Sequence, residues 1–226
     1  GLGGSATTDG GTGLARALGY RFLDEHGREI PLGGGSLINM ATIDDSNVSD
    51  EVQAIPITLA CDVTNPLTGP RGAAYVFAPQ KGADSHQVKL LDQGLAKFAD
   101  VIADYRRRVI DLNDSHETGS AAETLRGTSH RIPIDIRNVP GAGAAGGTGG
   151  GLLGLFNARI EPGIDLVLNL LHAREACAWA DAVITGEGSI DAQTPYGKVP
   201  SGIARLAKTQ GKPAIAIGGK VAHDPQ

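Results

Sequence analysis

Apolar residues at helical spacing mark one long segment in the middle of the chain. From Val88 to Tyr105, apolar side chains recur every three or four residues, the spacing of a single buried helix face. This pattern predicts the clearest helix of the sequence. Shorter helical patterns occur at residues 14–18, 166–180 and 203–207. The first is predicted to stop at Gly19, and the last to be capped by Gly211.

Runs of apolar and β-branched residues predict the strands. We expect a buried strand at 55–61 and a strand at 132–136. "DAVITGEGSID" is predicted to be a short buried strand that runs into a loop, and "KPAIAIGG" a further strand. The last third of the chain is therefore predicted to form a strand–helix–strand unit. Such a unit normally joins parallel strands through a right-handed crossover. Ligands of open α/β sheets bind beyond the carboxyl ends of such strands. Glu187, Asp191 and Gly218–Gly219 are therefore predicted at that edge.

Glycine interrupts these patterns in clusters. The 33 glycines among 226 residues are about twice the usual share. Polar, glycine-bearing loops adjoin apolar segments at 3–13, 62–72, 141–151 and 186–198. Backbone N–H groups freed by glycine beside a helix N-terminus can bind an anion such as phosphate. The loops thus favour an anion site, without specifying the anion.

Charge and cysteine content narrow the class of protein. A net charge of −5 and the lack of a basic stripe argue against nucleic acid as a partner. The one basic run, Arg106–Arg108, is interpreted as a solvated helix end that opens a polar surface excursion at 106–131. Cys61 and Cys177 lack metal-ligand spacing, so neither zinc nor a disulfide framework is predicted. No apolar run is long enough to cross a membrane, and a cytoplasmic location fits these features.

Two nucleotide-binding patterns match incompletely. Gly141-x-Gly143-x-x-Gly146, with Asp165 further on, has the outline of a dinucleotide fingerprint. However, Pro140 stands where a strand should lead into the turn, and so many glycines produce such matches by chance. Gly197-Lys198-Val199 lacks the hydroxyl residue of a phosphate-binding P-loop. No histidine-based or GxSxG catalytic pattern occurs.

Acidic and lysine residues within the glycine loops carry the candidate chemistry. They are Asp9, Asp62, Lys81, Glu187, Asp191 and Lys198. Phosphoryl transfer uses this mixture, because carboxylates hold Mg²⁺ or accept a proton while lysines and amides neutralise phosphate charge. Taken singly, Asp9 could cap the following helix, Asp62 could form an Asx turn, and the lysines could be solvated. An NAD-binding oxidoreductase and a non-catalytic module binding a sugar acid or nucleotide remain alternatives.

The amino-acid sequences of four glycine-containing segments resemble those of a known family. "GLGGSATTDGGTGLARALG", "ACDVTNPLTGPRGAAYVFAPQKGA", "VPGAGAAGGTGGGLL" and "DAVITGEGSIDAQTPYGKVPSGIARLAK" are similar, in this order, to type I glycerate kinases. The resemblance implies phosphorylation of D-glycerate by ATP with Mg²⁺, in bacteria usually to 2-phosphoglycerate. These substrates would be the only partners, with neither nucleic acid nor membrane.

The resemblance also implies a fold and a fragment. The fold is α/β with two domains, one Rossmann- or flavodoxin-like and one, inserted into it, resembling a restriction endonuclease. Residues 1–170 would be mostly inserted domain, and 171–226 a partial return to the Rossmann-like domain. Family members extend beyond both ends of this sequence, so the chain is expected to be an internal fragment. The segment 106–131, between the long helix and "VPGAGAAGG", is longer than the corresponding segment usually is in the family.

Residue roles are assigned from loop chemistry alone. Asp191 is the predicted base for the glycerate hydroxyl, Lys198 and Lys81 face phosphates, and Asp62 or Glu187 binds Mg²⁺. The predicted substrate or phosphate contacts are Gly3, Gly4, Ser5, Ala6, Thr7, Asp9, Asn65, Lys81, Gly143, Gly186 and Gly188. The phosphorylated hydroxyl and the oligomeric state are left open.

Overall fold

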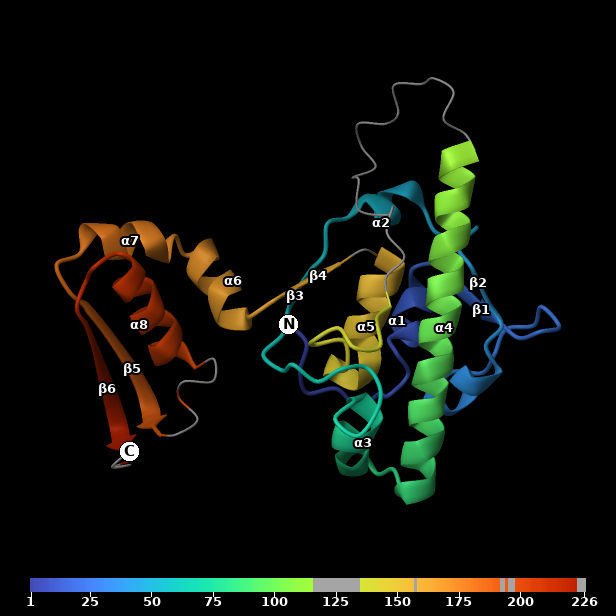
Figure 1. The fold of residues 1–226 in the computed structure, drawn as a ribbon, viewed down its shortest axis with the longest axis horizontal. Coiled ribbons are helices and arrows are strands. Elements are labelled where there is room, and N and C mark those ends of the chain that lie inside the picture. Colours follow the sequence, from blue (N-terminus) through green and yellow to red (C-terminus); the bar gives the residue numbers. More distant parts are fainter. Residues whose placement is uncertain (116–134, 157, 192–193, 195–197, 223–226) are drawn as a thin grey trace. The chain divides into compact units, whose positions relative to one another are not determined.

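The chain forms two compact units, Gly1–Ile160 and Glu161–Gln226, shown in Figure 1. The computed structural model describes residues 1–115, 135–156, 158–191, 194 and 198–222. Most of the strand predicted at 132–136 lies outside these ranges. No helix among the described residues is both long and apolar enough to cross a membrane. The interpretation of residues 1–170 as an inserted domain stays a prediction.

The first unit combines helices with short strands. In chain order its elements are α1 (Thr12–Ala17), β1 (Arg21–Leu23), the 3₁₀ helix η1 (Gly34–Asn39), β2 (Thr42–Asp44), α2 (Asp50–Ala54), β3 (Thr58–Ala60), α3 (Ala73–Phe77), the 3₁₀ helix η2 (Pro79–Lys81), α4 (Ser85–Ser115) and α5 (Ala144–Phe156), with β4 (Arg159–Glu161) reaching the boundary. β1 pairs antiparallel with β2, and β3 pairs with β4.

Helix α4 confirms the predicted periodic helix and extends it at both ends. It packs against η1, α3 and α5 and runs the length of the unit (Figure 1). The expectation of an irregular surface excursion from residue 106 was wrong as far as 115, because the helix continues there. The remainder of that segment, with His116 and His130, lies outside the described residues.

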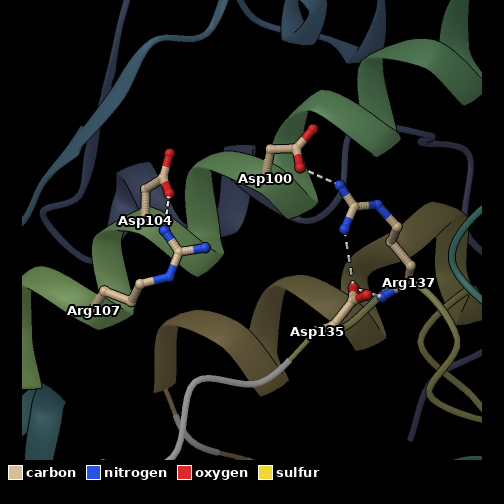
Figure 2. Close-up of polar contacts among 5 residues, drawn as sticks. All are labelled: Asp100, Asp104, Arg107, Asp135 and Arg137. Atoms are coloured by element: carbon tan, nitrogen blue, oxygen red, sulfur yellow. Dashed lines mark hydrogen bonds and ion pairs between the residues drawn. The ribbon is translucent and has the colours of Figure 1, made fainter.

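Arg106 corrects the interpretation of the arginine run. Its side chain is buried rather than solvated, and its guanidinium donates to the main-chain oxygen of Leu153 at 3.0 Å. That oxygen lies near the end of α5, where helical carbonyls lack intrahelical partners. Arg107 instead pairs with Asp104 on the surface of α4 (Figure 2), as expected of a solvated helix residue.

The hydrophobic core lies in the first unit. The largest fully buried side chains are Phe22, Leu37, Met40, Leu67, Leu95, Phe98, Ile102 and Ile136. The rings of Tyr20 and Phe156 meet edge to face with centroids 5.1 Å apart, a favourable geometry for aromatic pairs. The core therefore joins α4 and α5 to β1 and η1.

The strand predicted at 55–61 is shorter in the structure. Only Thr58–Ala60 forms β3, and the preceding residues form α2, whose Ser49 caps the helix by accepting the Val52 N–H. Pro56 has no N–H and disfavours helix at the residue before it. The sequence thus changes from helix to strand across Ile55, which is exposed.

The second unit contains α6 (Gly163–Leu170), α7 (Ala173–Trp179), β5 (Val183–Ile190), α8 (Val199–Thr209) and β6 (Ala214–Val221). β5 and β6 are parallel, with Ile184 opposite Ile215, which confirms the strand–helix–strand prediction. Gly211 follows α8 at φ +67°, as predicted for a left-handed cap. The helix predicted over 166–180 is instead two helices, because His172 adopts φ 51° between them.

Strand β5 corrects the predicted position of one glycine loop. The strand continues to Ile190, so Gly186, Glu187 and Gly188 lie within it and not in a loop. Gly218 and Gly219 likewise lie inside β6. Strand β5 is also less buried than predicted, since Ile184 is exposed. The polar loop therefore begins at Asp191, after the strand.

Candidate functional site

The opening loop is held by Asp9. Its carboxylate is buried and accepts the N–H groups of Gly11 at 3.0 Å and Gly13 at 3.1 Å. Both donors lie at the start of α1, where main-chain N–H groups lack helical partners. Asp9 therefore caps the helix, the simpler of its predicted roles, and its contact with a substrate stays a prediction.

Close packing on two sides fixes the path of this loop. A Cβ at Gly146 would lie 1.9 Å from the Thr7 oxygen, and one at Gly34 would lie 1.9 Å from the Thr8 oxygen. Gly10 also donates its N–H to the Gly146 oxygen at 3.1 Å. Gly146 has φ +68°, a conformation that glycine adopts without strain. The two glycine-rich loops therefore pack directly on each other.

Lys81, at the end of η2, brings a positive charge to the opening loop. Its amine donates to Ser5 Oγ at 2.9 Å and to the main-chain oxygen of Thr7. Burial lowers the pKa of the Lys81 amine, although the nearby Asp9 carboxylate acts in the opposite direction. The predicted residues Ser5, Thr7, Asp9 and Lys81 thus form one cluster. Gly3, Gly4 and Ala6 are exposed beside it.

Asn65 and Gly143 form a second meeting point of loops. The Gly143 N–H donates to the Asn65 oxygen at 3.0 Å, and Gly143 is buried. A Cβ at Gly143 would lie 2.2 Å from the Pro66 oxygen. Its backbone therefore faces protein, which removes the basis for a pyrophosphate-binding turn. Gly143 supports the loop, and its direct contact with substrate stays a prediction.

The predicted catalytic pair lies in the second unit. Asp191 follows β5, and its carboxylate is 3.4 Å from the amine of Lys198, which stands immediately before α8. Thr194 is buried, and its hydroxyl accepts the Asp191 N–H at 2.9 Å. The sequence reading missed this threonine; its signal is a hydroxyl residue three positions after an aspartate, a spacing typical of turns.

Glu187 has an unsatisfied oxygen. Among the residues that the structure describes, its buried Oε2 has no hydrogen-bond partner, an arrangement that costs free energy unless a ligand completes it. Asp62, the other predicted Mg²⁺ ligand, is exposed in the first unit. No group of three or more metal-ligating side chains occurs in the described ranges. The convergence of Asp62 with Glu187 and Asp191 stays a prediction.

Taken together, the fold and these loops define an α/β protein in which glycine-rich segments present lysines and carboxylates. Comparison with known proteins gives the family. The glycerate kinase family model matches residues 1–226, and the chain belongs to this family. It is 44% identical to the glycerate kinase of Halalkalibacterium halodurans over 98% of this chain and 51% of that protein.

Two further similar proteins are also described as glycerate kinases. The glycerate 2-kinase of Escherichia coli is 40% identical over 99% of this chain and 52% of that protein. A crystal structure described as a glycerate kinase 2 of Salmonella typhimurium LT2 superposes with a TM-score of 0.79 at 40% identity, covering 98% of this chain and 55% of that one. The chain thus spans about half the length of the curated relatives that it matches.

Proposed function

We propose that the protein containing this chain phosphorylates D-glycerate with ATP, most simply to 2-phosphoglycerate. The observation that carries the proposal is the family match along all 226 residues. The polar loops support it, because lysine amines and glycine amides are suited to phosphate groups. We further propose that the second unit belongs to a Rossmann-like domain and the first to an inserted, endonuclease-like domain.

In the proposed reaction, Asp191 accepts the proton of the attacking glycerate hydroxyl. The hydroxyl oxygen forms a bond to the γ-phosphorus, and the bond from that phosphorus to the β-γ bridging oxygen breaks, which leaves ADP. The amine of Lys198 lies 3.4 Å from the Asp191 carboxylate and would hold it in place for this proton transfer. The Ser5–Thr7 loop and Lys81 bind an oxyanion of one substrate.

The residues present fit a magnesium ion. Mg²⁺ prefers oxygen ligands and is usually bound through one or two carboxylates together with substrate phosphates. The unpartnered Glu187 Oε2 meets that requirement, and Asp62 is the alternative proposed carboxylate. When bound, the ion would neutralise phosphate charge. Equilibrium dialysis with Mg²⁺ and a nucleotide tests this without turnover, and Glu187→Gln is expected to weaken retention of the ion.

The activity is tested by coupling ADP formation to D-glycerate addition and identifying the product by ³¹P NMR. The Asp191→Asn variant is expected to lose at least about 100-fold in kcat, whereas Asp181→Asn, which removes an exposed charge just before β5, should retain it. Circular dichroism confirms that both variants fold. Near-normal turnover by the Asp191 variant would exclude it as the base, and inactivity of the unmodified protein would overturn the proposed function.

The alternatives receive less support. The hypothesis of an NAD-binding oxidoreductase depended on the glycine pattern from Gly141 to Gly146. In the structure, Gly143 and Gly146 are packed against the main-chain oxygens of Pro66 and Thr7. A non-catalytic binding module does not account for the family match. Calorimetric titration separates the three, since a kinase should bind ATP with Mg²⁺ but not NAD, and only a binding module would bind without turnover.

A further inference from the structure

A polar recess of about 290 Å³ lies in the first unit, apart from the Lys81 cluster. It is formed where the loop after β3 meets the segment before α5. Its lining residues are Thr64, Asn65, Pro66, Arg71, Asn138 and Pro140. A volume of this size suits a small organic acid or a phosphate group. Below we call it the Arg71 recess.

Hydrogen bonds hold both walls of the Arg71 recess. The Leu67 N–H donates to the Arg137 oxygen at 2.9 Å, which joins the two segments across the recess. Asn65 Nδ2 donates to the Arg71 oxygen at 2.8 Å, which closes the loop that carries this arginine. The main chain of Arg71 is therefore placed before any ligand arrives, and preorganisation of this kind lowers the cost of binding.

The two arginines beside the recess differ in their charge environment. Arg137 forms ion pairs with Asp100 on α4 and with Asp135 (Figure 2), and its hydrogen bond to Asp100 raises the pKa of its guanidinium. Its charge is thus already neutralised. Arg71 is exposed, and its guanidinium makes no hydrogen bond or ion pair with any residue in the described ranges.

The chemistry of the lining favours an oxyanion. Its members include one cation and no carboxylate. Guanidinium binds planar carboxylates and phosphates through two parallel hydrogen bonds. The hydroxyl of Thr64 and the side-chain amide of Asn138 supply further donors. Because Arg71 is the one charged residue of this lining, a negatively charged group is the ligand that it favours.

We propose that the Arg71 recess binds an oxyanion group of a substrate, with Arg71 as its charged ligand. The anion is a carboxylate or a phosphoryl group. Its assignment to glycerate or to ATP rests on the proposed function, whereas the existence of the anion site does not. The proposal adds Arg71, which the sequence reading passed over, to the binding residues.

Steady-state kinetics of the full-length protein test the assignment. Arg71→Gln is expected to raise the KM of one substrate by about tenfold or more, with a smaller effect on kcat. A raised KM for D-glycerate identifies the carboxylate, and a raised KM for ATP identifies a phosphate. Arg71→Lys should recover only part of the affinity, since lysine cannot bind in a bidentate manner. Lys89→Gln removes a charge from the exposed face of α4 and is the matched control.

A second measurement does not require turnover. Phenylglyoxal modifies accessible guanidinium groups, and peptide mass mapping reports the rate at each arginine. D-glycerate, ATP or inorganic phosphate should protect Arg71 in the unmodified protein, while exposed Arg28 should react at an unchanged rate. Absence of protection by all three probes, together with KM values matching those of Lys89→Gln, would overturn the proposal. If a ligand protects Arg71 but the protein shows no kinase activity, the anion site is supported and only the proposed function is rejected.

Discussion

At the scale of single residues, Lys81 combines two tasks. Its amine is bound to Ser5 and to the Thr7 oxygen, so it holds the opening loop while bringing a positive charge to it. The sequence predicted the charge, because lysine in a glycine-rich setting is suited to phosphate. It could not predict the partners, which lie more than seventy positions away in the chain.

Two buried tyrosines give the first unit a predicted sensitivity to alkaline pH. Tyr20 donates to the Leu155 oxygen at 2.9 Å, and burial raises its pKa from 10.0 to about 12. Tyr105 donates to Asp45 at 2.6 Å, and its pKa is also raised, first by burial and then by the neighbouring Tyr20. Both native pKa values exceed the unfolded one, so the stabilisation is complete below pH 10 and is lost as the pH rises through about 12 for Tyr20.

We therefore expect the free energy of unfolding to fall above pH 10, by up to roughly 1.4 kcal/mol per pH unit for each tyrosine. Urea unfolding at pH values from 9 to about 11.5 measures this slope. In the Tyr20→Phe/Tyr105→Phe variant the slope should be smaller, and in Tyr75→Phe, at an exposed position, it should not change. Equal slopes in all three proteins would contradict the prediction.

At the scale of elements, the packing of α5 against the opening loop depends on Gly146. An alanine there combines an unfavourable φ of +68° with a Cβ 1.9 Å from the Thr7 oxygen. Gly27 has a similar φ of +74° but open space around its Cβ position. Comparing the two substitutions separates the steric clash from the cost of the backbone conformation.

Gly27→Ala should cost about 1–2 kcal/mol of unfolding free energy, and Gly146→Ala at least about 3 kcal/mol. Urea denaturation followed by circular dichroism provides both values. A Gly146 variant no less stable than the Gly27 variant would show that the loop can move away from α5. The expected destabilisation by the clash with Thr7 would then be wrong.

The elements that the sequence predicted are those defined by local pattern. Helix α4 follows from its periodicity, and the parallel pair β5 and β6 from their apolar runs. The buried face of α4 even extends to Arg106, four positions after Ile102, although its charge favoured a solvated interpretation. Gly186 and Gly188 were predicted in a polar, glycine-bearing loop, and glycine is uncommon in strands. Their place within β5 depends on pairing with β6, which no local pattern reveals.

At the scale of the whole molecule, the two units differ in how they bury apolar surface. The buried residues of the connected hydrophobic core all lie between Ala15 and Ala158. In the second unit, by contrast, large apolar side chains are exposed on helices and strands alike. They include Leu170, Leu171, Trp179, Ile184, Ile215 and Ile217. A two-stranded sheet with an uncovered face is marginally stable on its own.

We therefore expect a polypeptide of residues 1–160 to fold by itself and one of residues 161–226 not to do so. The first should unfold cooperatively in urea and retain the near-ultraviolet circular dichroism of its packed aromatic residues, because the connected core lies within it. The second should bind the dye ANS and unfold without a sharp transition, with the emission of its single Trp179, 89% exposed, already at the wavelength of a solvated indole. Cooperative unfolding of the second polypeptide alone would show that its few buried residues suffice, and loss of structure in the first would show that its core depends on the second unit.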